Sequence, residues 1–362
     1  MSDADVSALS GSAPALPEAT AAVRPQSPGQ RAWARFRRNR LGHVSLWLFI
    51  VVLLLTTLAE VISNDKPFVA RINGQWWFPA LDNPSEKTLG GDFLTATDWK
   101  DPFIVERLRQ AGNWSVGAPN PHSADSIDYF AEQISPGPPS AANWLGTDSK
   151  GRDMLARLVY GFRVSIWFGI ALTLVGTAIG VLMGSLMGYF GGRLDLTLQR
   201  LIEIWGAVPE LFLLIIFASI FQPSLALLLI LLSAWGWMGL SDYVRAEFLR
   251  NRALDHVKAA RALGLSNLQI IWRHVLPNSM TPVITFLPFR MSAAILALTS
   301  LDFLGLGVPA STPSLGELLQ QGKANLDAWW IIVPTFLLLV LTMLLLTFIG
   351  DALRDAFDTR KS

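Results

Sequence analysis

The chain has 362 residues, of which 51% are hydrophobic and 16% are charged, and it contains no Cys. A charged fraction well below the ~25% typical of soluble domains excludes a disordered chain. The absence of Cys excludes disulfides, thiolate metal sites and Cys nucleophiles. The 29 Lys and Arg nearly balance the 28 Asp and Glu, so the net charge gives no reason to expect nucleic-acid binding.

The hydrophobic residues are concentrated in long runs. A bilayer core of ~30 Å requires ~20 apolar residues in helical conformation. Six runs fit this requirement and predict six transmembrane helices: 44–62, 164–190, 201–221, 225–240, 282–301 and 329–349. The first run follows 43 residues and precedes no small-residue cleavage site, so we predict a retained helix and not a signal peptide.

Basic residues are concentrated in alternate connecting segments. Segment 243–281 carries six of them, whereas 222–224 has none and 302–328 has one. Residues 31–40, just before the first run, carry five more: Arg31, Arg35, Arg37, Arg38 and Arg40. The positive-inside rule therefore predicts that both termini are cytoplasmic.

The predicted fold is an all-α polytopic membrane protein with six transmembrane helices. Its expected parts are a cytoplasmic tail with an amphipathic basic segment (1–43), a first transmembrane helix (44–62), an outside segment (63–163), a five-helix core that includes a cytoplasmic loop at 243–281 (164–349), and a cytoplasmic tail (350–362). The outside segment makes this fold unusual, because it inserts about 100 residues after the first helix.

Two soluble segments leave alternatives open. Residues 1–30 are rich in Ala, Ser and Pro, which is typical of a disordered tail. The Arg-rich stretch 31–41 also contains Trp33 and Phe36, and it fits either a helix lying on an anionic leaflet or the flank of the first span. In the outside segment, the aromatic residues of 76–78 either bind a ligand or partner, or else form the segment's own core or lie at the membrane interface.

The segment Gly146–Asp153 is similar to a phosphate-binding loop only in its glycines. A P-loop requires Lys and then Ser or Thr after the last glycine, where Arg152 and Asp153 stand here. The carboxylate of Asp153 would repel a phosphate, and the segment is predicted to lie outside the cell. We therefore expect this chain to bind no nucleotide cofactor itself.

The second predicted helix carries a ridge of glycines at four-residue intervals. They are Gly176, Gly180, Gly184 and Gly188. Small residues at this spacing let the backbone of another helix approach closely. The ridge predicts helix packing, within this subunit or against a partner.

One predicted helix carries a charge near its centre. Arg290 lies in the middle of the run 282–301, where a charge costs ~2.5–3.5 kcal/mol on insertion scales. Glu203 and Glu210 are the acids available within the membrane. We therefore predict an intramembrane charge pair between Arg290 and one of these glutamates.

The segment 243–281 predicts two helices separated by a glycine turn. Residues 243–263 read as helix, and Gly264 follows as a residue able to take the left-handed conformation. Ser266 and Gln269 form a capping box that opens a second helix, which Pro277 would end. This short helix has one apolar face, formed by Leu268, Ile271, Trp272 and Val275. A position between two spans disfavours DNA binding and favours docking into a groove of a cytoplasmic partner.

The same segment resembles the EAA loop of ABC importer permeases. Ala259, Ala260, Gly264, Leu276 and Pro277 match its pattern. Lys258 replaces the usual Glu, and His274 replaces the usual Ile.

Further motifs resemble the oligopeptide/dipeptide branch of these permeases. They are the spaced Gly, Asp and Arg residues of 146–165, the sequence Phe303-Leu-Gly-Leu-Gly307, and residues 38–41. Segments 76–79, 299–302 and 314–317 are similar to the Yej-type sub-branch of microcin C and peptide uptake systems.

The resemblance implies a MetI-like permease fold in the bacterial inner membrane, with segment 63–163 in the periplasm. It implies two non-identical permease subunits around a peptide pathway, two cytoplasmic subunits that hydrolyse ATP–Mg, and a periplasmic or lipid-anchored binding protein. It also implies that the chain is surrounded by membrane lipid and that no nucleic acid takes part. The residues expected to couple this chain to the ATPases are Lys258, Ala259, Ala260, Gly264, Trp272, Leu276 and Pro277.

Two other functions are alternatives to this one. A self-contained secondary transporter or channel would show internal repeats and helices broken at the midplane. We find no such repeat, although Pro209, Pro288 and Pro334 can break helices. A membrane enzyme would need clustered polar residues near one face, but the histidines at 43, 122, 256 and 274 are scattered. The chain is therefore expected to be a non-catalytic subunit.

Overall fold

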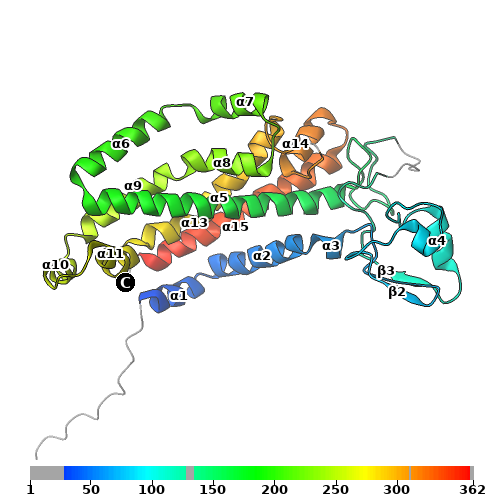
Figure 1. Ribbon diagram of the computed structural model, residues 1–362, viewed down its shortest axis with the longest axis horizontal. Coiled ribbons are helices and arrows are strands. Elements are labelled where there is room, and N and C mark those ends of the chain that lie inside the picture. Colours follow the sequence, from blue (N-terminus) through cyan, green and yellow to red (C-terminus); the bar gives the residue numbers. More distant parts are fainter. Residues whose placement is uncertain (1–27, 128–133, 310, 359–362) are drawn as a thin grey trace, which may run out of the picture.

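The computed structural model describes residues 28–127, 134–309 and 311–358. These residues form an elongated helical bundle with a small, loop-rich part at one end, called the sheet end here (Figure 1). The short helices α10 (Asp255–Ala262), α11 (Asn267–Ile270) and α12 (Leu276–Ser279) lie at the opposite end. The helices α1 (Pro28–Arg38) and α15 (Trp329–Phe357) bring both described termini to that same end.

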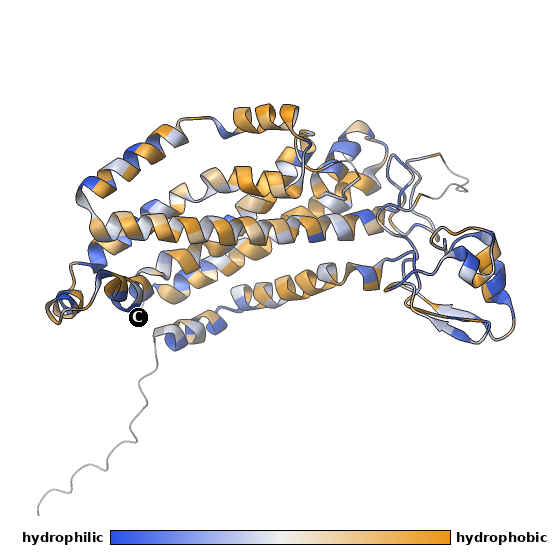
Figure 2. Ribbon diagram, viewed as in Figure 1, coloured by the Kyte–Doolittle hydropathy of each residue, from blue (hydrophilic) through white to orange (hydrophobic). Residues whose placement is uncertain are grey.

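Within the described residues, five helical segments are long and apolar enough to cross a membrane. They are α2 (Arg40–Thr57), α5 (Met154–Phe190), α8 with α9 (Leu225–Gly236 and Met238–Asn251), α13 (Thr281–Phe303) and α15. A sixth span exists if α6 (Gly192–Gly206) and α7 (Glu210–Ile220) count as one. Figure 2 shows hydrophobic residues over most of these helices, as a lipid-facing surface requires.

The run predicted over 201–221 is broken. The axes of α6 and α7 differ by 64°, so this run is a bent pair of helices and not one continuous helix. Pro209 lies at the break, where it caps α7 in extended conformation. A proline cannot donate a backbone hydrogen bond to the preceding turn, which favours the end of α6 here. The other two prolines considered as helix breakers, Pro288 and Pro334, lie inside continuous helices.

The bundle is built around α5, which packs against α9 and α13, while α15 packs against α2 and α13. The helix α5 has 37 residues, and at ~1.5 Å per residue it is longer than a bilayer core is thick. It begins at Met154 with Asp153 as N-cap, so part of the predicted outside segment is helical. Similarly, α15 continues to Phe357 and includes residues predicted as a tail.

The helix α1 lies against the end of α15. Phe36 is buried there with Ala352 and Ala356, and the Arg35 guanidinium donates to the Asp358 carbonyl at 3.2 Å. Trp33 is half exposed and stacks on Phe36. One face of this basic helix is thus fixed to the protein. Residues 1–27, predicted as a disordered tail, lie outside the described residues.

The sheet end corrects the prediction of an all-α fold. Strands β1 (Val69–Ile72), β2 (Gln75–Trp77) and β3 (Trp114–Val116) form an antiparallel sheet in the order β2-β1-β3. In its register, Arg71 lies opposite both Trp76 and Trp114. A 3₁₀ helix (Glu86–Leu89) and the helices α3 (Ala59–Ile62), α4 (Pro102–Arg109) and α14 (Leu315–Ala324) complete this end.

The aromatic residues of the sheet end divide between two roles. Trp77 packs on a small core formed by Ala70, Ile72, Leu89, Trp99 and Ile104. Trp76 is 56% exposed and meets Trp114 edge-on, with ring centroids 5.5 Å apart. The alternative in which the aromatics form the segment's own core therefore holds for Trp77 and not for Trp76.

Candidate functional site

The candidate site is the loop of α10, α11 and α12, called the α10–α12 loop, which follows α9. The helix predicted over 243–263 is in fact two helices, because the chain turns at residues 252–254 between α9 and α10. This turn directs Val257 and Ala260 of α10 back towards Phe248 of α9, with which they form one buried cluster. Burial of apolar side chains thus outweighs the continuation of a single helix.

The turn between α10 and α11 is a Schellman C-cap. The Gly264 amide donates to the Arg261 carbonyl at 3.0 Å. The Leu265 amide donates to the Ala260 carbonyl at 3.2 Å. Gly264 has φ +81°, and an added Cβ would meet no atom within 4 Å. Backbone conformation, and not crowding, is therefore what favours glycine here.

The predicted capping box opens α11. Ser266 Oγ accepts from the Gln269 amide at 3.4 Å, and Gln269 Oε1 accepts from the Ser266 amide at 3.0 Å. The chain then widens into a π-helix over Ile271–Val275. The prediction that Pro277 ends the helix is wrong, because helical conformation continues to Ser279.

The π-helix also changes which side chains share a face. A wider turn does not follow the 3.6-residue period on which the predicted apolar face depended. Val275 is fully buried, whereas Leu268 is 65% and Trp272 is 63% exposed. Leu263, at the preceding turn, is 80% exposed. The loop therefore has one apolar face on the bundle and presents a second apolar surface outward, formed by Leu263, Leu268 and Trp272.

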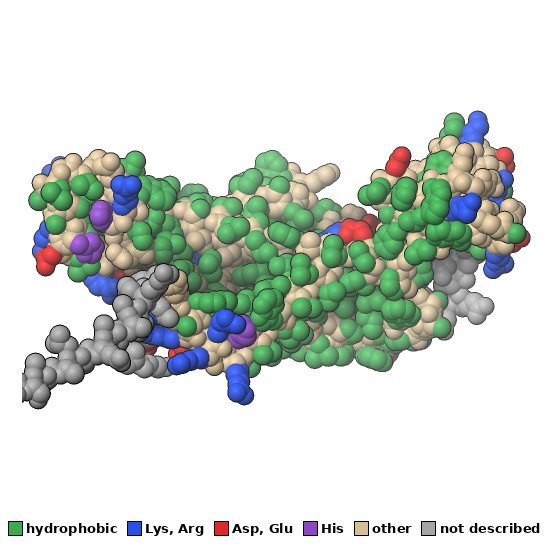
Figure 3. Space-filling view, turned by 90° about the horizontal axis from the view of Figure 1, so that it is seen from below, with side chains coloured by type: hydrophobic (Ala, Val, Ile, Leu, Met, Phe, Trp, Pro, Cys, Tyr) green, Lys and Arg blue, Asp and Glu red, His purple; other side chains and the backbone are tan. Residues whose placement is uncertain are grey.

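The residues predicted to couple to a partner lie mostly on the surface of this loop. Lys258, Ala259, Gly264, Trp272 and Pro277 are exposed, Leu276 is half-buried and Ala260 is buried. Lys258 Nζ lies 3.1 Å from Asp255 Oδ1 one turn away, and both side chains are largely exposed. Charged side chains gather towards the two ends of the molecule, whereas its middle is mostly hydrophobic (Figure 3).

Polar contacts that the sequence did not reveal fasten the loop to the bundle. The Tyr189 hydroxyl, at the end of α5, donates to Asn267 Oδ1 at 2.8 Å. The Arg261 guanidinium lies 5.8 Å from the centre of the Tyr189 ring. Asn251 Nδ2 of α9 donates to Ser279 Oγ of α12 at 2.8 Å. Each contact joins residues far apart in sequence, which is why no local motif indicated them.

The glycine ridge of α5 lies against the span formed by α8 and α9. A Cβ at Gly180 would lie 2.9 Å from the Trp237 carbonyl oxygen, and one at Gly184 would lie 2.6 Å from that of Ser241. At Gly188 it would meet the Arg245 carbonyl at 2.6 Å. Only glycine permits this approach of the two backbones. Gly176 differs, because a Cβ there would meet the Arg290 guanidinium at 2.7 Å.

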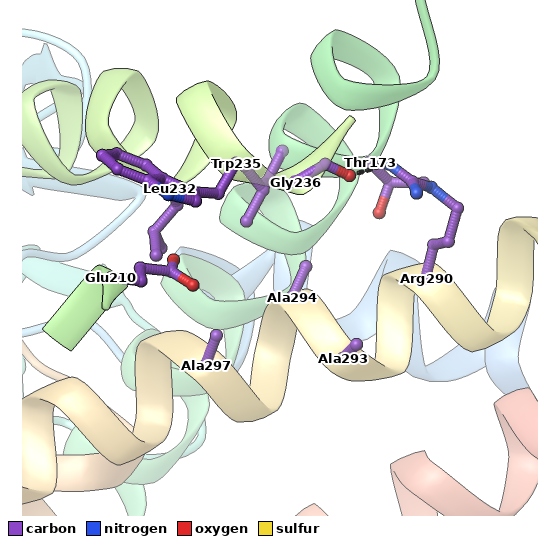
Figure 4. Close-up of a pocket in the computed structure, with 10 residues that line it drawn as sticks. Thr173, Glu210, Leu232, Trp235, Gly236, Arg290, Ala293, Ala294 and Ala297 are labelled. Atoms are coloured by element: carbon purple, nitrogen blue, oxygen red, sulfur yellow. Dashed lines mark hydrogen bonds between the residues drawn. The ribbon is translucent and has the colours of Figure 1, made fainter. Parts of the chain in front are cut away.

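Arg290 is not paired with a glutamate. Its Nη2 donates to the Gly236 carbonyl at the end of α8 at 2.8 Å, where the helix dipole favours a cation. Glu203 pairs instead with Arg200. Glu210 lines the same pocket as Arg290 (Figure 4), but among the described residues no ion pair joins them. The predicted pair is therefore corrected to a helix-end contact.

A buried ion network, absent from the predictions, occupies the junction between α5 and α14. Arg152 Nη2 lies 2.6 Å from Asp148 Oδ2 and 3.0 Å from Glu317 Oε1. Arg157, which is fully buried, pairs with the same Glu317. Gln321 Nε2 donates to Glu317 Oε1 at 3.0 Å.

The contacts of Arg152 in this network set the direction of its pKa shift. Burial by itself lowers the pKa of the Arg152 guanidinium, but its hydrogen bond to Asp148 and the charges of Asp148 and Glu317 raise that pKa above its ordinary value. Arg152 has a structural role, because it pairs with Asp148 and Glu317. Asp153 has one too, because it caps α5 and accepts from Asn120 and Asn143. The motif segments 146–165 and 314–317, which the resemblance indicated separately, meet here.

Two family models match parts of this chain. The family model "Binding-protein-dependent transport system inner membrane component" matches residues 180–362, and "N-terminal TM domain of oligopeptide transport permease C" matches residues 27–75. The inner membrane ABC transporter permease protein YejE of Escherichia coli is 50% identical over 92% of this chain and 97% of its own length.

More distant relatives carry related names. The peptidoglycan transport system permease protein YejE of Agrobacterium fabrum is 42% identical over 94% of this chain and 96% of its own length. The dipeptide transport system permease protein DppC of Lactococcus lactis is 30% identical over 92% of this chain and 91% of its own length. These matches distinguish an ATP-driven permease from a secondary transporter. The chain therefore belongs to the family of binding-protein-dependent ABC transporter permeases, in its oligopeptide/dipeptide branch, and is a multi-pass protein of the bacterial inner membrane.

Proposed function

We propose that this chain is the permease subunit of an importer for peptides or peptide-like compounds, coupled to ATPase subunits through its α10–α12 loop. It forms the pathway with a second, homologous permease and receives substrate from a periplasmic or lipid-anchored binding protein. The names of the relatives, which include dipeptide and peptidoglycan transport permeases, support this substrate class. Microcin C is a peptide-like compound of this class, and the Yej-type motifs favour it.

One observation carries the coupling proposal. The α10–α12 loop presents Leu263, Leu268 and Trp272 outward, while its other face is buried against α9 and the end of α5. An exposed apolar surface on a well-anchored helix pair is typical of a site that docks into a groove of a partner. A partner that moved this loop would also move the bundle helices to which it is fastened.

The orientation that we propose places the α10–α12 loop, α1 and the end of α15 in the cytoplasm. The sheet end then lies in the periplasm, as an enlargement after the first of six crossings. Support comes from the basic residues of α1 and of the loop. In this proposal ATP and Mg²⁺ are bound by the cytoplasmic subunits, and this chain contributes no catalytic residue.

The experiment that tests this proposal combines the Leu268→Ala and Trp272→Ala substitutions. Both side chains are exposed, so folding and membrane insertion should be unchanged while co-purification of the ATPase subunits falls at least 10-fold. Leu326→Ala is the matched control, because Leu326 is 80% exposed but lies outside the loop, between α14 and α15. Equal recovery of the ATPase subunits with the double variant and the control would contradict the proposal.

A further inference from the structure

A pocket of about 270 Å³ lies between α5, α13, the end of α8 and the start of α7. Its floor is formed by alanines of α13, among them Ala293 and Ala297, whose small side chains leave the space open (Figure 4). The Trp235 ring forms a wall and stacks on Trp205, with centroids 5.1 Å apart. Arg290 and Glu210 project into opposite ends of this pocket (Figure 4).

The polar groups of the pocket are incompletely satisfied by the protein. Arg290 Nε, Trp235 Nε1 and Thr173 Oγ1 are buried and have no hydrogen-bond partner among the residues that the structure describes. Native structures leave few buried polar atoms unpaired, and such atoms need an explanation. All three belong to residues that line one pocket, where a ligand reached by a small movement of these side chains would supply the missing partners.

Arg290 has more hydrogen-bond donors than its contact with α8 uses. A guanidinium carries five N–H donors, and Arg290 gives one of them to the Gly236 carbonyl. A role limited to capping α8 would leave the others unexplained in a segment where a charge is costly. Gly176 is the residue that leaves room for this guanidinium, since a Cβ there would meet it at 2.7 Å.

Glu210 complements this group with the opposite charge. It is the first residue of α7 after the break at Pro209. Its carboxylate makes no hydrogen bond or ion pair with the residues that the structure describes. The pocket thus has a cationic donor end, an apolar middle and an anionic acceptor end. A zwitterion with an apolar centre fits this order of groups.

We propose that this pocket is a substrate subsite within the membrane. It binds a short peptide with its free carboxylate on Arg290 and Thr173 and its free ammonium towards Glu210. The volume is slightly below the about 300–1,000 Å³ of typical small-molecule sites, so it accommodates a short peptide or one segment of a longer one. This assignment rests on the proposed function as a peptide importer.

The test uses the complete importer in proteoliposomes with its binding protein. Uptake is measured for a tripeptide with free termini, for its C-terminal amide and for its N-acetyl form, and each variant is compared with the unmodified protein on the same peptide. Arg290→Gln should lower uptake of the free peptide about 10-fold and leave uptake of the amide nearly unchanged. Glu210→Gln should lower uptake of the free peptide and spare the N-acetyl form. Arg290→Lys, which keeps the charge, should show an intermediate loss.

The outcomes separate this subsite from the proposed function. Import of no peptide by the unmodified complex would reject the function itself. Normal import, together with an Arg290→Gln variant that affects the free peptide and the amide equally, would overturn only the subsite.

A second measurement applies if Arg290→Gln fails to assemble. The chain has no Cys, so Ala293→Cys provides a single thiol in the pocket. A small thiol reagent should label it, and transported peptide should slow this labelling at least 3-fold. Ala253→Cys, in the exposed turn after α9, is the control and should be unaffected by peptide. Absence of labelling, or labelling at Ala293→Cys that peptide does not slow, would contradict the subsite.

Discussion

The two ends of the bundle are held together by different forces. At the sheet end, buried charges join α14 to α5 and to the segment before it, with Glu317 contacting both Arg152 and Arg157. At the other end, the α10–α12 loop is held by apolar packing around Phe248 and by two local helix caps. Buried ion pairs require strict geometry because their desolvation is costly. The sheet end is therefore fixed in one arrangement, whereas the loop keeps an apolar surface for a partner.

The difference is also one of sequence distance. The pair of Arg157 and Glu317 joins residues 160 positions apart. The caps of the loop join residues three to five positions apart, as in the contact of Ser266 with Gln269. Local contacts form the loop's own shape, while Tyr189, Asn251 and the apolar cluster connect it to the helices that cross the membrane. At the sheet end, in contrast, the ion pair of Arg157 with Glu317 joins elements that are far apart in the sequence.

The largest expected effect is at the sheet end. Glu317→Gln removes the negative charge that compensates Arg157 and Arg152, so the free energy of unfolding should fall by about 3–5 kcal/mol, as for other broken buried ion pairs. Thermal unfolding of the purified permease in detergent measures this loss. Glu106→Gln is the matched control, because the Glu106–Arg109 pair is exposed, and its stability should not change. A Glu317→Gln protein as stable as the control would show that the network is not structural.

An intermediate effect is expected at the Schellman turn. Gly264→Val places a branched side chain at φ +81° and should cost about 1–2 kcal/mol locally. Membrane insertion should be retained, while stimulation of ATP hydrolysis in the assembled importer should be lost. Gly264→Asn is the control, since Asn tolerates the left-handed conformation. Normal peptide uptake by Gly264→Val would refute the assignment of this turn to coupling.

The smallest effect on stability is expected at Lys258. Its contact with Asp255 is exposed, and exposed pairs contribute little. Lys258→Ala should therefore leave thermal unfolding unchanged but weaken the affinity of the permease for the ATPase subunits at low salt. Co-purification across a salt series measures this. A marked loss of stability instead would place Lys258 in the loop's own packing.

The sequence predicted those features that depend on neighbouring residues. The capping box and the turn at Gly264 were visible because all their atoms belong to one short segment. The separation of Val275 from Trp272 was not, since the two share the predicted apolar face but Val275 is buried and Trp272 exposed in the π-helix. The partners of Glu317 and of Arg290 were also inaccessible to periodicity, because each is set by the packing of distant helices. The break at Pro209 was indicated only by the proline itself.

The central claim is that the α10–α12 loop is the contact between this permease and its ATPase subunits. Because the chain lacks Cys, Leu268→Cys can carry a single photo-cross-linker in the assembled importer, with Leu326→Cys as the control outside the loop. We predict that Leu268→Cys cross-links to an ATPase subunit and that Leu326→Cys does not. Cross-linking of Leu326→Cys alone, or of neither position in an importer that hydrolyses ATP, would contradict the account.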